Sequence, residues 1–146
     1  MPTRNADARW QGDLKTGKGT MKLGSGVWEG PYSFASRFES GTGTNPEELI
    51  GAAHAGCFSM ALTAGLNKAG FQPRQVHTTA KVHLEKVGES FGITAIDLDS
   101  EADVPNIDDA TFQQHAEAAK AGCPISKALS AVPIRLNARL GAGVGK

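Results

Sequence analysis

Apolar and polar residues alternate along several segments of the chain, and this period of two is typical of β-strands. The clearest example begins at Val76, where every second side chain faces the same way and most of one face is apolar. A glycine-rich turn, Thr16–Gly19, separates two short segments and predicts a hairpin. We expect strands at residues 8–11, 20–23, 32–38, 76–86, 91–101 and 133–140.

One segment is apolar without alternation and predicts a long helix. Asn45 is a good N-cap, Pro46 suits the first helical position, and Glu48 stands three residues after the cap. Apolar residues continue to Leu66, and Gly70 can end the helix. Because a helix that is apolar nearly all round is buried on all sides, we expect a second copy of the chain to cover part of it in a dimer.

Two further helices follow the strands in the second half of the chain. Asn106 and Asp109 resemble an N-cap and its partner for a helix to about Ala121, and residues 124–129 predict a short helix. The order of strands, helix, strands, helix and strand predicts an α+β fold. We expect one domain, made of N-terminal strands and a linker (1–44), a central helix (45–70), and strands, a second helix and a last strand (76–146).

The composition is that of a globular protein, with 40% hydrophobic and 21% charged residues. Lys plus Arg and Asp plus Glu both number 15, so no net charge favours nucleic acid or a membrane surface as a partner. The start of the chain has no apolar core of a secretory signal, and we expect no segment long enough to span a bilayer. These features predict a cytoplasmic protein, in which disulfides are mostly transient and catalytic.

The sequence contains two cysteines, and each has a distinctive setting. Cys57 lies on the long apolar helix, where a cysteine often only fills space. Cys123 directly precedes Pro124 at the start of the short helix, where the helix dipole and free amides favour a thiolate, although an ordinary cap has the same sequence. We interpret them as a working redox pair, and expect their Cα atoms to lie within the roughly 7 Å that a disulfide needs.

Three polar residues near these segments each have two interpretations. His54 lies three residues before Cys57 on the same helix face, where it either donates to the thiolate or is a satisfied core or interface residue. Arg37, on the small-residue face of its expected strand, is either a site residue or a surface charge. Glu47 lies in the first helical turn, where the dipole alone favours a carboxylate.

Two apparent motifs fail their context tests. Gly12–Gly19 nearly spells a phosphate-binding loop, but Gly19 stands where a Ser or Thr is needed and the next segment predicts a strand. The four histidines and two cysteines show no CxxC or HExxH spacing, so we expect no zinc site. The expected chemistry needs no metal and no other cofactor.

The segments around both cysteines resemble the OsmC/Ohr family of thiol-dependent peroxidases. The matching blocks are Asn45–Cys57 and Ala121–Ser126, and the order of strands and helices extends the resemblance over nearly the whole chain. The resemblance implies an OsmC-like fold, in which antiparallel sheets wrap around two central helices. It also implies an intertwined homodimer with two active sites at the subunit interface.

By the same resemblance, Cys57 attacks the peroxide, Cys123 resolves the intermediate, and an arginine paired with Glu47 activates the thiol. Arg37, together with a histidine at position 54, matches the OsmC branch, and Arg9 is the other claimant for the activating arginine.

The predicted reaction begins with a Cys57 thiolate and gives a sulfenic acid, then a Cys57–Cys123 disulfide. A thiol reductant, such as a dihydrolipoyl-type dithiol, reopens it by exchange. Apolar neighbours (Leu49, Ile50, Phe58 and Met60) favour organic hydroperoxides, beside hydrogen peroxide, and a role in oxidative or osmotic stress defence. Two other functions remain open: a non-catalytic dimer that binds a small apolar ligand, and a cysteine hydrolase that uses Cys57 and His54.

Overall fold

The computed structural model describes residues 2–141, which fall into two compact units, one up to Leu49 and one from Ile50 onward. Each unit contains its own three-stranded sheet. Residues 142–146, which end the segment that we expected over 76–146, lie outside the described residues.

The first unit contains an antiparallel sheet in the order β1-β2-β3. Its strands are β1 (Ala6–Gln11), β2 (Lys18–Leu23) and β3 (Glu29–Tyr32). The predicted hairpin is confirmed, with Gln11 opposite Lys18. Gly12 has φ +95°, a backbone conformation that glycine adopts without steric cost, and it lets the chain leave β1 sharply.

The strand predicted over residues 32–38 is wrong, because a short helix, α1 (Phe34–Phe38), takes its place. A reciprocal pair of serines starts it: Ser33 Oγ accepts from the Ser36 N–H (3.1 Å), and Ser36 Oγ accepts from the Ser33 N–H (2.8 Å). This capping box satisfies two backbone donors at the helix start and outweighs the alternation of the sequence. Arg37 therefore lies in the last turn of a helix and not on a strand face.

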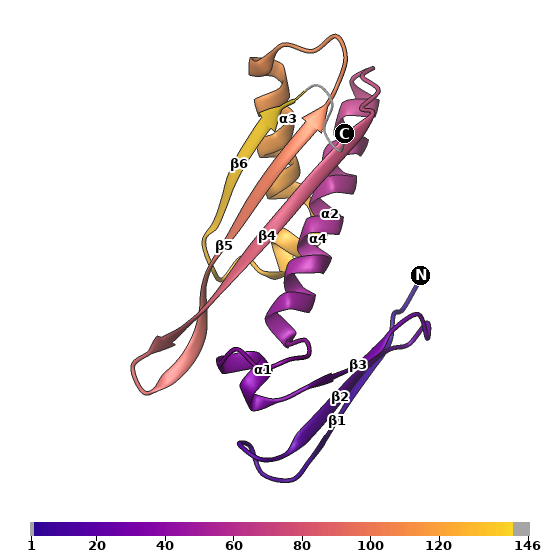
Figure 1. The fold of residues 1–146 in the computed structure, drawn as a ribbon. Coiled ribbons are helices and arrows are strands. Elements are labelled where there is room, and N and C mark those ends of the chain that lie inside the picture. The colour runs from indigo at the N-terminus through magenta and orange to yellow at the C-terminus, as the bar shows by residue number, and fades with distance from the viewer. Residues whose placement is uncertain (1, 142–146) are drawn as a thin grey trace. The chain divides into compact units, whose positions relative to one another are not determined.

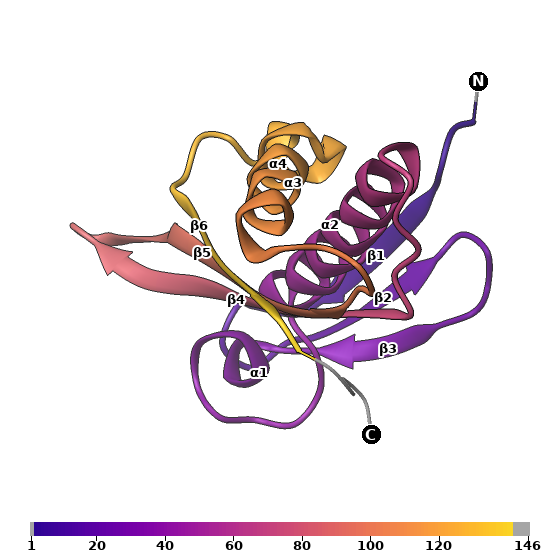
Figure 2. The same ribbon diagram turned by 90° about the horizontal axis from the view of Figure 1, so that it is seen from above.

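The second unit has the sheet order β4-β5-β6, built from β4 (Gln75–Val87), β5 (Ser90–Asp103) and β6 (Ile134–Leu140). Helices α2 (Pro46–Lys68), which begins in the first unit, and α3 (Asp109–Gly122) lie on the same face of this sheet (Figures 1 and 2). A one-turn helix, α4 (Pro124–Ala128), follows α3. The core between them is apolar and includes Phe58, Leu62, Leu66, Ile96, Leu98, Ala102, Phe112, Ala116 and Ala138.

We expected antiparallel sheets, but the sheet of the second unit is mixed. β4 pairs antiparallel with β5, whereas β6 runs parallel to β5. A parallel neighbour requires a crossover connection, and here α3 and α4 supply it between the two strands. Cys123 lies within this crossover, so the connection that allows the parallel pairing also carries the second cysteine.

The N-cap predicted for α3 is also wrong. Asn106 has φ +69°, outside helical geometry, and the cap is Asp108, whose carboxylate accepts from the Thr111 N–H. A carboxylate at the N-cap also favours the helix dipole, so Asp108 serves both purposes.

Helix α2 has a cap and an end as predicted. Asn45 Oδ1 accepts from the Glu48 N–H at 2.7 Å, and Gly70 has φ +94° just past the helix. One stripe of the helix is fully buried within the chain: His54, Phe58, Leu62 and Leu66. The opposite side carries the exposed residues Ala52, Gly56, Met60 and Ala64, and Met60 is 76% exposed.

The expectation that no segment is long enough to span a bilayer does not hold for α2, which is long and apolar enough by length and composition alone. The core helix of a soluble protein passes the same test, so this finding alone is weak support for a membrane span. The two sides of α2 differ in how far they are exposed, although both are apolar.

The burial of His54 predicts that stability falls in mildly acidic solution. Desolvation lowers the pKa of His54 below its ordinary 6.5, whereas in the unfolded chain the pKa returns to that value. As the pH falls below about 6.5, His54 binds a proton in the unfolded state but not in the folded state. The free energy of unfolding therefore drops by up to about 1.4 kcal/mol per pH unit. Urea unfolding at several pH values checks this, with His54→Gln as the comparison. The same pH dependence in both proteins between pH 7 and the lowered folded pKa would contradict it.

Candidate functional site: a pair of neighbouring thiols

The two cysteines meet although they come from distant parts of the sequence. Cys57 lies in the middle of α2, and Cys123 is both the C-cap of α3 and the N-cap of α4. Their Sγ atoms are 2.7 Å apart, and both residues are free thiols. A disulfide bond is about 2.05 Å long, so a shift of well under 1 Å joins them. The prediction that the two sulfurs lie within bonding reach of one another is confirmed.

The environment of the pair shifts the pKa values of the two thiols in opposite directions. Burial and the neighbouring Cys123 raise the pKa of Cys57. Burial also acts to raise the pKa of Cys123, but the hydrogen bond with Cys57 and the amide and hydroxyl donors of Ser126 outweigh it and lower that pKa. Among residues 50–141 no cation is among the causes that act on Cys57. This unit by itself therefore favours the thiolate on Cys123.

His54 does not donate to Cys57, the first of the two interpretations given to it. Its ring is fully buried, and Nε2 lies 2.7 Å from Oγ of Ser126 on α4. The other ring nitrogen, Nδ1, is buried without a hydrogen-bond partner among the described residues. Ser126 is 4% exposed and was not predicted as a site residue, although it ends the sequence block that resembles the family motif.

Arg37 and Glu47 form a bidentate ion pair in the first unit. Arg37 Nε donates to Oε1 of Glu47 at 3.1 Å, and Nη2 donates to Oε2 at 2.9 Å. Glu47 is 7% exposed and lies in the first turn of α2, where the helix dipole favours a carboxylate. A bidentate pair fixes the plane of the guanidinium, so Arg37 is held in one orientation.

Two hydrogen bonds fix the chain segment that carries this pair. Asn45 Nδ2 donates to the carbonyl of Ser36 at 3.0 Å, and Ser36 Oγ donates to the carbonyl of Thr44 at 2.7 Å. They link α1, which carries Arg37, to the residues just before α2, which carries Glu47. The rival arginine, Arg9, is exposed on β1 in a small polar pocket with Asp7, Lys22 and Glu29.

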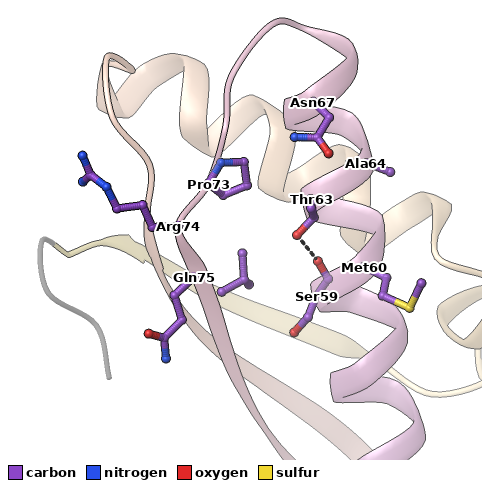
Figure 3. Close-up of a pocket in the computed structure, with 9 residues that line it drawn as sticks. Ser59, Met60, Thr63, Ala64, Asn67, Pro73, Arg74 and Gln75 are labelled. Carbon is purple, nitrogen blue, oxygen red and sulfur yellow. Dashed lines mark hydrogen bonds between the residues drawn. The ribbon is translucent and has the colours of Figure 1, made fainter. Parts of the chain in front are cut away.

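The apolar residues that favoured an alkyl pocket at Cys57 differ in their burial. Phe58 is fully buried in the core, whereas Met60 is exposed on the other side of α2. Met60 lines a pocket of about 490 Å³ in which Ser59, Thr63 and Asn67 on α2 lie opposite Pro73–Gln75 (Figure 3). Its one charged side chain, Arg74, is paired with Asp103 at 3.3 Å, and the pocket contains neither cysteine.

Within residues 2–141, no three His, Cys, Asp or Glu side chains come together as a metal-ligand set.

Comparison with known proteins relates this arrangement to one family. Residues 39–137 match the family model described as OsmC-like protein. Peroxiredoxin OsmC of Escherichia coli (strain K12) is 55% identical over 129 residues, which cover 88% of this chain and 90% of that protein. Peroxiredoxin OsmC of Shigella flexneri matches equally well.

Solved structures give the same result for the fold. An organic hydroperoxide resistance protein from Elizabethkingia anophelis has a TM-score of 0.73 at 25% identity, over 98% of both chains. OhrB of Bacillus subtilis has a TM-score of 0.70 at 24% identity, over 94% of this chain and 98% of that one. The expected OsmC-like α+β fold is confirmed, and the chain belongs to the family of OsmC-like proteins.

Proposed function

We propose that this protein is a thiol-dependent peroxidase that reduces organic hydroperoxides, and hydrogen peroxide as well, in the cytoplasm as part of oxidative or osmotic stress defence. The observation that carries the proposal is the pair of free thiols 2.7 Å apart in the second unit. A cysteine that only fills space needs no second cysteine beside it. The name peroxiredoxin of the 55% identical relative supports the same reaction.

In the proposed reaction the Cys57 thiolate attacks the terminal oxygen of the peroxide, the O–O bond breaks, and an alcohol or water leaves. Cys57 becomes a sulfenic acid. Cys123 then attacks the sulfur of Cys57, water leaves, and a disulfide forms. A dithiol of the dihydrolipoyl type returns both cysteines to thiols by exchange.

The raised pKa of Cys57 shows what the first step still needs. Burial opposes the thiolate, and residues 50–141 supply no cation that restores it. A guanidinium at the sulfur lowers the thiol pKa and stabilises the leaving oxygen. Arg37 fits this role better than Arg9 because its guanidinium is already oriented by a bidentate pair with the buried carboxylate of Glu47.

We further propose that each site is built from two chains of a homodimer. Glu47 and Cys57 are ten positions apart on α2, which is about 15 Å of helical rise. A carboxylate at one end of that span does not reach back along a straight helix to the same chain's sulfur. The exposed apolar side of α2, with Met60 76% exposed, supplies a surface that a second copy can cover. A two-fold dimer then supplies one Arg37–Glu47 pair to each of its two sites.

The competing functions have less support from the geometry. A cysteine hydrolase needs its histidine on the nucleophile, but Nε2 of His54 is bonded to Ser126. A non-catalytic ligand-binding dimer accounts for the pocket beside Met60 but not for the proximity of the sulfurs.

Replacing the nucleophile tests the reaction itself. In Cys57→Ser, peroxide consumption with a dithiol reductant should fall by at least about a thousandfold, because the attacking sulfur is gone. In Cys123→Ser, a trapping reagent should find a persistent sulfenic acid on Cys57, because no sulfur resolves it. Ser59→Ala, two positions along α2, is the matched control and should keep its activity. Unchanged turnover in Cys57→Ser would refute the peroxidase.

Mixing two inactive variants tests the shared site. We expect Cys57→Ser and Glu47→Ala each to be inactive alone, and an equal mixture with free subunit exchange to recover about one quarter of the wild-type rate. Half of the dimers are then heterodimers, and one of their two sites has both native residues. Sedimentation and mass spectrometry verify exchange. Heterodimers without activity would show that Glu47 serves its own chain, and a stable monomer would exclude the dimer.

A further inference from the structure

Ser126 joins the histidine to the sulfur pair. It lies on the first turn of α4, three residues after Cys123, and its side chain is buried. Its Oγ is 2.7 Å from Nε2 of His54, which comes from α2. Its hydroxyl and its backbone N–H also act on the Cys123 sulfur and lower the pKa of that thiol. Cys123 is the N-cap of α4 and Ser126 lies in its first turn, so the hydroxyl that bonds the imidazole also lies near the sulfur.

The unpartnered nitrogen of His54 decides which way this hydrogen bond runs. A neutral imidazole carries one proton, on Nδ1 or on Nε2. With the proton on Nδ1, a buried N–H donor has no acceptor among the described residues. Unpaired buried donors are rarer than unpaired acceptors, so the proton belongs on Nε2. Nε2–H then donates to Ser126 Oγ, and the hydroxyl proton of Ser126 is free to point elsewhere.

We propose that His54 and Ser126 are positioning residues for the resolving thiol: His54 holds the Ser126 hydroxyl so that its O–H donates to Sγ of Cys123 and stabilises the thiolate. This inference rests on the proposed peroxidase function, because Cys123 resolves a sulfenic acid only in that reaction. Burial keeps His54 neutral at neutral pH, because it lowers the pKa of the imidazole. We call the hydrogen bonds from His54 to Ser126 and from Ser126 to Cys123 the relay. In this relay the imidazole only donates a hydrogen bond, and it neither gains nor loses a proton.

The thiolate serves the second step of the reaction. The Cys123 sulfur attacks the Cys57 sulfenic acid, the new S–S bond forms as the S–O bond breaks, and the departing hydroxide takes up a proton as water. In the reduction that follows, a reductant thiolate attacks one sulfur of the disulfide, a mixed disulfide forms, and the other sulfur leaves as a thiolate. Cys123 is fully buried and Cys57 is not, so attack falls on Cys57 and Cys123 leaves as the thiolate that Ser126 stabilises.

The charged and titratable groups around this relay come from three helices. His54 and Cys57 face it from α2. Lys120 of α3 and Lys127 of α4 line a pocket of about 340 Å³ that Ser126 also lines, and Lys120 is paired with Glu117 at 3.3 Å. Replacing Ser126 by Ala leaves all of these groups in place. A change in the titration of Cys123 in that variant therefore reports the lost hydroxyl.

The test titrates Cys123 alone. In the Cys57→Ser background, the ultraviolet absorbance of the remaining thiolate is followed against pH. We expect Ser126→Ala to raise the Cys123 pKa by about one unit or more, which is the loss of one hydrogen bond to a charged group. Ser59→Ala removes another half-buried hydroxyl, bonded to Thr78 at 2.8 Å, and should leave the pKa unchanged.

Variants of His54 separate positioning from packing. His54→Leu should raise the Cys123 pKa as Ser126→Ala does, whereas His54→Gln keeps an N–H donor and should hold it near the starting value. In chains with Cys57 restored, the pH at which disulfide formation after one peroxide turnover is half-maximal should move by the same amounts. If Ser126→Ala and Ser59→Ala give the same pKa, or His54→Leu and His54→Gln do, the relay is overturned. Because the titration uses no peroxide, its outcome stands apart from that of the proposed function.

Discussion

The packing of one stripe of α2 against α3 and the β4-β5-β6 sheet is the constraint on which the site depends. Phe58, Leu62 and Leu66 are fully buried there, and each such side chain contributes about 1.5–3 kcal/mol through its removal from water. The same stripe continues to His54, and Cys57 is next to it in sequence. Because α2 cannot rotate without exposing this stripe, Cys57 is held at the junction of α3 and α4. The thiol pair is thus a product of core packing, with no covalent or metal crosslink required.

Burial has an electrostatic cost that the site offsets unequally. Removing a thiolate from water raises its pKa, and one pKa unit corresponds to about 1.4 kcal/mol. Cys123 lies at a helix start with the donors of Ser126 beside it, whereas Cys57 lies in mid-helix, where the backbone amides are already bonded. A mid-helix cysteine depends on donors or cations from outside its own helix, and at Cys57 the backbone donor of Ile125 is outweighed by burial, so its pKa stays raised. The inequality of the two thiols is therefore a physical argument for an arginine at Cys57.

The sequence predicted those elements whose local signals and tertiary environment agree. The cap at Asn45 and the strand from Val76 were found because the pattern and the packing require the same conformation. Residues 32–38 were mistaken for a strand because alternation was weighed above the Ser33 and Ser36 pair, which forms bonds that only the folded turn reveals. The proximity of Cys57 and Cys123 was expected from their settings and family blocks. Ser126 was missed because its bond to His54 spans 72 positions, and no local pattern encodes it.

The cost of keeping His54 in the core argues that it does more than fill space. A buried polar atom without a partner costs about 1–3 kcal/mol, and Nδ1 is such an atom within the described chain. Leucine is similar in size and avoids that cost, but it would leave the buried Ser126 hydroxyl without its bond to Nε2. The bond between Nε2 and Ser126 therefore offsets part of the cost of the imidazole, and in the proposed relay the same bond positions the hydroxyl for Cys123. The proposed relay thus gives the imidazole and the serine a part in the thiol chemistry, as the proposed reaction gives the Arg37–Glu47 pair the task of orienting a guanidinium.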